Sequence, residues 1–487
     1  MFSKLKREMV HIRLGRVLAG FALLAVVAGC GGGSPNSPTR PGETHSSETP
    51  SSAATEWLTT ADGSQKLARS VPSGPASAPV ITVDDSSRYQ QFWGVGAALT
   101  GASAQLIGRL SGERRDQLMR SLFSPSQGAG LSVLRQPIGA NDFSIGSHSL
   151  DDTAGNGPDP QLRHFGLGPD HQGVLPLVRQ AQDLNPGLTV VASPWSAPAW
   201  MKSNTALIGG TLNGQYYAAY GRYLARTVAA WQAAGLRVRA LTVQNEPSFS
   251  PAGYPGMTLT PDQQAHLLSQ FTRPALDAAG LRQVGLWALD DNYDRAGDAA
   301  QIASTARSAI AGVAFHCYSG SVSAMQSFGQ QHPGLPLAIS ECTGGDWSPD
   351  FGANLRYDVQ SLLIDGIRAG ASWVLKWNVA LDPSGGPANG GCQHCRGLVT
   401  VDPGSGQVTY SEAYYALAQL GRFIQPGAVV VGSSSSPVPN VAFRNPDGSH
   451  ALLAMNSAGA SVSFRVSDGG HSFAASLPAG AAATFTW

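Results

Sequence analysis

Short apolar runs alternate with helix-patterned segments through the middle of this chain, over residues 93–425. Each run has the length of one buried strand. The runs are 130–135, 188–192, 238–243, 284–289, 312–316, 335–340 and 373–377. Neighbouring parallel strands need a crossover connection, usually a helix, so this order predicts a parallel sheet covered by helices. Two architectures remain, a closed (β/α)8 barrel and an open doubly wound sheet.

Helix signals lie between several of these runs. One apolar stripe recurs at spacings of three and four through 217–231, and Gly235 follows it as a stop signal. The stretch Thr260-Pro261-Asp262-Gln263 has the residue types of an N-cap, a first-turn proline and a capping-box partner. A further stripe, 355–367, ends before Gly370. No glycine-rich phosphate loop follows any strand, which favours the barrel, an α/β TIM barrel, over the open sheet.

Both ends of the chain carry short strand-like runs separated by turn residues. Near the C-terminus Val462, Phe464 and Val466 alternate with polar residues, which is typical of a strand with one buried face. Neither end alone has enough strands for a stable sheet. We therefore predict an all-β sandwich domain built from 55–92 plus 426–487, attached to a catalytic barrel over 93–425.

Residues 1–30 have the form of a bacterial lipoprotein signal peptide. A basic region precedes an apolar run over 17–27, which is too short for a spanning helix, and Val27-Ala28-Gly29-Cys30 resembles a lipobox. This predicts lipidation of Cys30, a flexible Gly/Ser/Pro linker over 31–54, and a membrane-anchored protein at the periplasmic face or cell surface. Gly31 favours the outer membrane in a Gram-negative source. The alternative is an ordinary secretory signal with an incidental cysteine.

The charge balance excludes some partners. The chain has 487 residues, with 32 Lys+Arg against 32 Asp+Glu, and only 13% of residues are charged. This balance makes no electrostatic case for nucleic acid or for an anionic membrane surface. The sequence does not determine the oligomeric state.

Polar residues stand where the predicted strands end. These ends carry Arg135, Ser193–Trp195, Asn245–Glu246, Asp290–Asn292, His316–Tyr318, Ser340–Glu341 and Trp377–Asn378. Parallel α/β folds keep their chemistry at this edge. Pro247 ends the strand before Glu246 and favours an extended backbone at Glu246. A lone Glu there would be a cap or an ion-pair partner. Two glutamates with tryptophans beside them indicate glycoside hydrolysis.

Several stretches, in order, resemble glycoside hydrolase family 30, the family of glucosylceramidase. They are 92–100, 142–144, Ser193-Pro-Trp-Ser-Ala-Pro-Ala-Trp-Met-Lys202, Val243-Gln-Asn-Glu-Pro247, Ser340-Glu-Cys342 and Trp377-Asn-Val-Ala-Leu-Asp-Pro-Ser-Gly-Gly-Pro387. The resemblance runs from about Trp57 to the C-terminus. It implies a barrel fused to a β-sandwich, and a retaining double displacement that needs no metal and no cofactor.

The resemblance also implies roles for individual residues. Glu246 would be the general acid/base at the end of the fourth strand, and Glu341 the nucleophile at the end of the seventh. Retention implies carboxyls about 5–5.5 Å apart, and a raised pKa for Glu246. The implied substrate-binding residues are Asn245, Trp195, Tyr318, Trp377, Arg135 and His316. For some the residues leave an alternative open: an ion-pair partner for Arg135, barrel core for Trp377, and a supporting group for His316. Asp290–Asn292 are expected to be loop caps.

Two positions depart from the family pattern. The family commonly has Thr-Asp, whose Asp binds the terminal sugar, where this chain has Thr100-Gly101. It often has His-Trp-Tyr where this chain has His316-Cys317-Tyr318. Loss of a charged hydroxyl ligand and of a ring wall is expected to weaken or redirect sugar recognition.

With Cys30 lipidated, an even number of cysteines remains in an oxidising compartment. Cys317 and Cys342 would lie at neighbouring strand ends, so a disulfide between them is geometrically plausible. Cys392 and Cys395 would then close a small ring in the loop after the eighth strand. A zinc site on these four thiols is the less favoured alternative.

These features favour a lipid-anchored retaining β-glycoside hydrolase of the glucosylceramidase or β-glucosidase type, acting on a carbohydrate or glycolipid. An endo-β-1,6-glucanase or xylan-directed hydrolase of the same family is the enzymatic alternative. The non-enzymatic alternative is a carbohydrate-binding surface lipoprotein, against which both glutamates argue.

Overall fold

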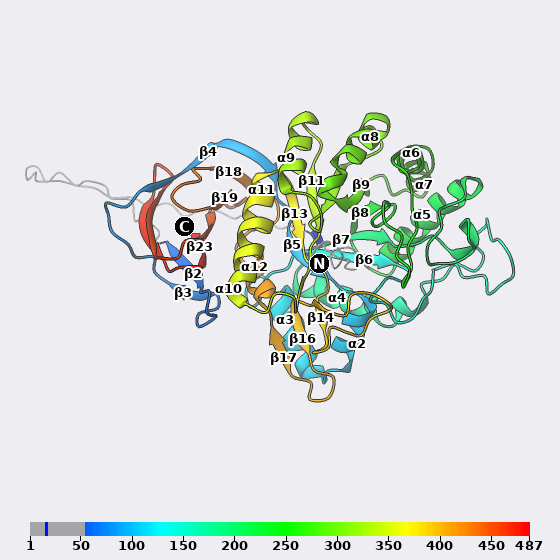
Figure 1. Ribbon diagram of the computed structural model, residues 1–487, viewed down its shortest axis with the longest axis horizontal. Coiled ribbons are helices and arrows are strands. Elements are labelled where there is room, and N and C mark those ends of the chain that lie inside the picture. Colours follow the sequence, from blue (N-terminus) through cyan, green and yellow to red (C-terminus); the bar gives the residue numbers. More distant parts are fainter. Residues whose placement is uncertain (1–14, 18–53) are drawn as a thin grey trace, which may run out of the picture.

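The computed structural model of the chain describes residues 15–17 and 54–487 (Figure 1). The predicted lipidation site Cys30, the rest of the signal segment and the linker up to residue 53 lie outside the described residues. Strand β1 (Gly15–Val17) pairs antiparallel with strand β7. Among the described helices, none is long and apolar enough to cross a membrane.

Eight parallel strands form a closed barrel. They are β5 (Gly94–Ala98), β6 (Val133–Ile138), β7 (Gly187–Pro194), β8 (Val238–Thr242), β9 (Gly285–Asn292), β10 (Gly312–His316), β11 (Leu337–Glu341) and β13 (Ala371–Leu375). Each strand pairs with the next, and β13 pairs with β5 to close the ring. Every residue of β5, β6, β10, β11 and β13 is buried, as both faces of such a strand require. The predicted fold class is confirmed.

Helices cover the outside of the barrel (Figure 1). They include α2 (Gly101–Arg109), α3 (Gly112–Phe123), α4 (Val174–Leu184), α5 (Tyr217–Ala233), α6 (Pro261–His266), α7 (Arg273–Ala278), α8 (Ala296–Ala306), α9 (Val322–Gln331), α10 (Phe351–Arg356), α11 (Asp365–Arg368) and α12 (Glu412–Gly421). The predicted capping box is confirmed, because Thr260 accepts from the backbone of Gln263 and Gln263 accepts from that of Thr260. Two π-helical segments, η4 (Leu267–Thr272) and η6 (Tyr357–Ile364), interrupt the helices on either side.

The second body is a β-sandwich to which both ends of the described chain contribute, drawn in dark blue and red in Figure 1. The N-terminal part supplies β2 (Thr55–Thr59), β3 (Ala68–Ser70) and β4 (Val80–Gln91). The C-terminal part supplies β18 (Val429–Ser433), β19 (Asn440–Arg444), β20 (His450–Met455), β21 (Val462–Ser467), β22 (Ser472–Leu477) and β23 (Ala482–Thr486). Strand β4 pairs with β18 along one edge and with β21 along the other.

The sandwich has its own apolar core, in which Ile81, Phe464 and Phe485 are fully buried. It also packs on the barrel, where Phe92 meets Phe443 at a ring-centroid distance of 5.2 Å. These contacts hold the barrel from one side, and the carboxyl ends of its strands carry the polar residues described next.

Candidate active site

Glu246 lies in the loop after β8, and its backbone is turned in an unusual way. Its φ is +41°, in the left-handed region that a non-glycine residue rarely adopts. The extended backbone predicted from Pro247 is therefore wrong. Two hydrogen bonds hold the turn: the Glu246 N–H donates to the Asp290 carbonyl, and Phe249 N–H donates to the Glu246 carbonyl, both at 2.9 Å. Tertiary contacts here overcome the local preference.

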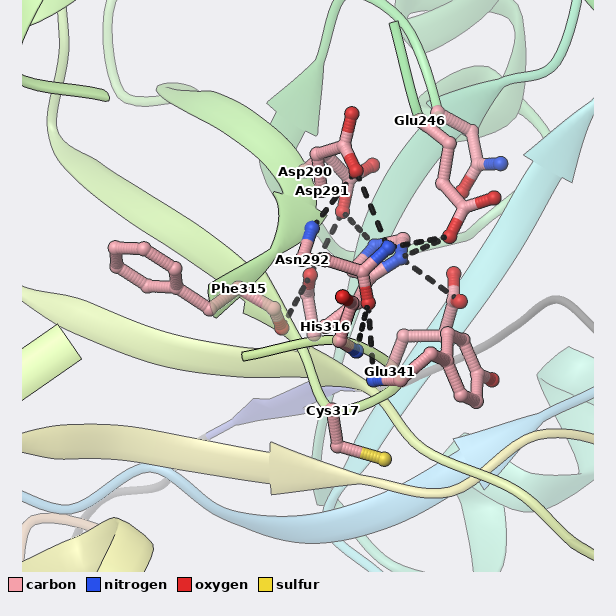
Figure 2. A network of polar contacts seen from close by, with 12 residues as sticks. Glu246, Asp290, Asp291, Asn292, Phe315, His316, Cys317 and Glu341 are labelled. Atoms are coloured by element: carbon pink, nitrogen blue, oxygen red, sulfur yellow. Dashed lines mark hydrogen bonds and ion pairs between the residues drawn. The ribbon is translucent and has the colours of Figure 1, made fainter. Parts of the chain in front are cut away.

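Glu341 is the last residue of β11 and is fully buried. The Nη1 of Arg135 donates to its Oε2 at 2.8 Å. The Nδ1 of His316 lies 2.8 Å from Oε1 of Glu341 and 3.2 Å from Oε1 of Glu246. Figure 2 shows the imidazole between the two carboxyls. One oxygen of Glu246 and one of Glu341 lie within 4.8 Å of each other.

Asp290, at the end of β9, connects the surrounding side chains. Its Oδ2 accepts from Arg135 Nη2 at 2.5 Å, and also from the hydroxyls of Ser193 and Thr242. Its Oδ1 accepts from Ser340 Oγ and lies 3.1 Å from Nε2 of His316. The interpretation of Asp290 as a loop cap is wrong, because this fully buried carboxylate holds residues from five strands. Its φ of +57° is a second left-handed backbone at the site.

Aromatic rings line the site beside these carboxyls. Trp195 and Trp377 are fully buried, with ring centroids 5.7 Å apart, and the guanidinium of Arg135 lies 4.8 Å from the Trp195 centroid. Phe143 meets Trp377 edge-on. Tyr318, two residues after the end of β10, is buried and belongs to the same apolar cluster. Asn245, also buried, accepts from Arg135 Nη2 at 2.8 Å. The predicted site residues therefore gather at one end of the barrel.

Burial perturbs both glutamates. It raises the pKa of Glu246 well above its usual range, and the negative charges of Asp291 and Asp290 add to this while Arg135 opposes it. Burial also raises the pKa of Glu341, with the Glu246 charge second and Arg135 again opposing. Two buried carboxyls this close cannot both ionise readily, so the pair favours one proton shared between them.

A metal ion fits this site poorly. Within the described part of the chain, Glu246, His316 and Glu341 each offer one ligand atom, all within 4.8 Å of one another. The guanidinium of Arg135, 2.8 Å from Glu341, already supplies a fixed positive charge there. The arrangement therefore suits carboxyl chemistry better than cation binding.

Asp142, on the loop after β6, had no role assigned from the sequence. It is fully buried, and no described residue offers its carboxylate oxygens a side-chain hydrogen bond. Burial raises its pKa well above the usual range although Arg135 opposes the rise. Its charge also acts on Glu246 and Tyr318, so it faces the site. The sequence offered one signal for Asp142, because the stretch Asp142-Phe-Ser144 follows the end of β6 by a few residues.

The two departures from the family pattern have structural consequences. Gly101 begins α2, and a Cβ there would come within 3.1 Å of the Ile145 backbone nitrogen. Thr100 caps that helix and donates to Asn378 Oδ1 at 2.7 Å. Cys317 forms a disulfide with Cys342, and a second disulfide joins Cys392 to Cys395.

Comparison with known proteins identifies this arrangement. The family model described as "Glycosyl hydrolase family 30 TIM-barrel domain" matches residues 92–424, and the "Glycosyl hydrolase family 30 beta sandwich domain" matches 427–485. The chain is 34% identical over 411 residues to the endo-1,6-beta-D-glucanase BGN16.3 of Trichoderma harzianum, covering 79% of this chain and 82% of that protein.

Two further comparisons support membership of the same family. The lysosomal acid glucosylceramidase of Mus musculus is 30% identical over 408 residues, covering 77% of each chain. The solved structure of the endo-beta1,6-glucanase BT3312 superposes with a TM-score of 0.83 at 26% identity, covering 89% of this chain and 99% of that one. This chain belongs to glycosyl hydrolase family 30 and is a glycoside hydrolase.

Proposed function

We propose that this protein is an endo-acting β-1,6-glucanase that cleaves by retaining double displacement, with Glu246 as general acid/base and Glu341 as nucleophile. The observation that carries the mechanism is the approach of the two carboxyls to within 4.8 Å. Retaining enzymes hold their carboxyls close, whereas inverting enzymes leave room for a water molecule between carboxyl and sugar.

In the first step Glu341 attacks the anomeric carbon while Glu246 protonates the departing glycosidic oxygen. Arg135, bonded to Oε2, stabilises Glu341 as a carboxylate, and burial keeps the proton on Glu246 until it is transferred. The glycosyl–Glu341 ester forms as the glycosidic bond breaks.

In the second step Glu246, now a carboxylate, removes a proton from water, and the hydroxide attacks the same anomeric carbon. The ester bond to Glu341 breaks and the β-configuration is restored. His316 contacts both glutamates and, with Nε2 on Asp290, keeps its ring in one orientation through both steps.

Substrate binding is assigned by position. Trp195 and Trp377 offer apolar faces against a pyranose ring, and Asn245 and Tyr318 lie beside the two carboxyls. Asp142 supplies the buried carboxylate that position 101 lacks, and sugar hydroxyls would add to the backbone N–H groups of Asp142 and Phe143 that its oxygens face. This assignment treats Asp142 as the anchor for the sugar in place of an Asp after Thr100.

The choice of β-1,6-glucan rests on the relatives, three of which are endo-1,6-beta-D-glucanases at 32% to 34% identity. It reverses the order of substrates expected from the sequence. A β-glucosidase acting on glucosylceramide-like glycolipids is the second candidate, favoured by the 30% identity to the mouse lysosomal protein. The predicted lipid anchor at Cys30 would hold either enzyme at a membrane surface.

A substrate panel tests the proposal. Linear β-1,6-glucan, β-1,3-glucan, glucuronoxylan and glucosylceramide micelles are incubated with the purified full chain, and product lengths are measured over time. Rapid appearance of mixed short β-1,6 oligosaccharides supports endo action. Release of glucose alone from the glycolipid supports the second candidate, and no turnover of any β-linked substrate contradicts both. Glu341→Gln and Glu246→Gln serve as the inactive controls.

A further inference from the structure

A disulfide joins the residues that directly follow His316 and Glu341. Cys317 comes after His316 at the end of β10, and Cys342 comes after Glu341 at the end of β11, with Cα atoms 5.2 Å apart. Figure 2 shows Cys317 beneath the polar network. Cys342 is fully buried, and Cys317 is half-buried. The cross-link therefore lies one residue from two groups whose relative position matters for chemistry.

The strand ladder is irregular at this point. Strands β10 and β11 pair Phe315 with Ile339 and then His316 with Glu341, so the register shifts and Ser340 is skipped. On the other side of β10 the pairing with β9 also shifts, between Ala314 and Phe315. Regular pairing normally sets how two strand ends align. Here it stops doing so one residue before His316.

Few backbone contacts hold the end of β11 beyond that shift. The pairing of β11 with β13 ends at Ile339 and Val374, two residues before Glu341. Further on, Cys317 N–H donates to the Glu341 carbonyl at 3.0 Å, and Trp377 N–H donates to the Cys342 carbonyl at 2.8 Å. The disulfide adds a covalent bond between the ends of β10 and β11, which the hydrogen bond from Cys317 to Glu341 also joins.

The side-chain contacts of Glu341 tolerate little displacement. Its two oxygens lie 2.8 Å from His316 Nδ1 and 2.8 Å from Arg135 Nη1. A shift of the β11 end by about 1 Å would lengthen both contacts past hydrogen-bond range and would move the attacking oxygen, an error of the size that costs about 100-fold in rate.

We infer that the Cys317–Cys342 disulfide positions Glu341 against His316 and Arg135, and thereby sets the rate of the glycosidic cleavage rather than the affinity for the sugar. The inference rests on the proposed role of Glu341 as nucleophile. Both cysteines are positioning residues in this inference, because they act through the neighbouring His316 and Glu341. In a chain with a tryptophan at 317, side-chain packing would have to position Glu341 instead.

The second disulfide provides a comparison. Cys392 and Cys395 are three positions apart, so their bond does not join two barrel strands directly. Cys395 begins the short strand β15 (Cys395–Arg396), which pairs with β12 (Gly344–Gly345), and both cysteines pack in the aromatic cluster of the site, so this pair is used only as a background that leaves one disulfide to reduce. A core variant of the sandwich, Leu477→Ala, lowers stability far from the site and controls for stability alone.

The test compares Cys317→Ser/Cys342→Ser with Cys392→Ser/Cys395→Ser, Leu477→Ala and the native chain on the substrate that the native chain turns over. The inference predicts that kcat falls by about tenfold or more in the first variant while KM stays within about threefold. Leu477→Ala keeps kcat within about threefold of the native value below its melting temperature, and Cys392→Ser/Cys395→Ser keeps a larger share of kcat than Cys317→Ser/Cys342→Ser does.

Reversible reduction makes the same test without a substitution at 317 or 342. In the Cys392→Ser/Cys395→Ser background, dithiothreitol reduces the remaining disulfide to two thiols and is itself oxidised to its cyclic disulfide. kcat should fall, and should return on reoxidation, while Cys317→Ser/Cys342→Ser is unaffected by the reagent. An active native enzyme whose kcat survives loss of this disulfide overturns the inference. A native chain that hydrolyses no β-glycoside overturns the proposed function instead.

Discussion

Arg135 Nη1 donates to Oε2 of Glu341 at 2.8 Å, and both side chains are fully buried. The same guanidinium donates through Nη2 to Ser193, Asn245 and Asp290. A buried carboxylate is stable only with such a partner. Arg135 therefore favours the carboxylate form of Glu341, against the effect of burial, and fixes the direction of its side chain.

Arg135→Lys tests that relationship. A lysine ammonium lacks the planar fork that reaches Glu341 and Asp290 together, so we expect kcat to fall by about 100-fold with the fold retained. Steady-state kinetics and circular dichroism measure the two effects. Arg114→Lys, whose native side chain donates to a surface carbonyl, is the control and should behave as the native chain. Unchanged kcat in Arg135→Lys would show that the guanidinium geometry is dispensable.

Asp291→Asn should change the pH dependence. The negative charge of Asp291 is the largest charge effect raising the pKa of Glu246, with Asp290 and Asp142 adding to it and Arg135 opposing. The groups facing Glu246 also include Glu341 and His316. Removing the charge lowers the pKa of Glu246, so the general acid loses its proton at lower pH.

The alkaline limb of the kcat/KM profile is therefore expected to move to lower pH in Asp291→Asn. Asparagine retains an oxygen that can accept from the Ser248 N–H, as Asp291 does at 3.0 Å. Asp298→Asn makes the same charge change on the outer helix α8 and should leave the limb in place. A shift to higher pH in Asp291→Asn would mean that the limb does not report Glu246.

Asp142→Asn should raise the stability of the fold and lower the activity. Burial raises the folded-state pKa of Asp142 above its unfolded value, so its ionisation destabilises the fold increasingly as pH rises through that range. Asparagine removes the charge at nearly the same volume. We expect unfolding to cost about 1–3 kcal/mol more at neutral pH, and the difference to shrink towards pH 4.

The same variant should lose turnover, chiefly through a raised KM, because the sugar loses its charged hydroxyl partner. Melting curves across pH and steady-state kinetics provide the two readouts. Asp402→Asn, at an exposed turn, is the control. A variant that is less stable at neutral pH and still binds substrate normally would contradict the role of Asp142.

Much of the fold followed from local pattern. The spacing of apolar runs located seven of the eight barrel strands, because a strand buried on both faces is mostly apolar, as β13 is. Strand β5 (Gly94–Ala98), made of small residues, was not among them. The Thr260 capping box was readable because its chemistry lies within four residues. The sequence pattern does not predict strand β22, because Ser472–Leu477 is rich in alanine and serine and becomes a strand by pairing with β21.

The site was harder to read in detail. Glu246 and Glu341 stand at strand ends, where the fold class alone directs attention. The left-handed backbone of Glu246 depends on the hydrogen bond that its N–H donates to the carbonyl of Asp290, 44 positions later in the sequence. The central place of Asp290 depends on five side chains from separate strands, and the burial of Asp142 on a loop. Such long-range contacts leave no local pattern in the sequence.

Trapping of the glycosyl–enzyme ester tests the central claim most directly. The native chain is incubated with a 2-deoxy-2-fluoro-β-glucosyl compound bearing a good leaving group, and its peptides are analysed by mass spectrometry. We expect time-dependent inactivation with one fluoroglucosyl group esterified to Glu341, and no label in Glu341→Gln. Turnover without a trapped ester, or a label on another carboxyl, would contradict it.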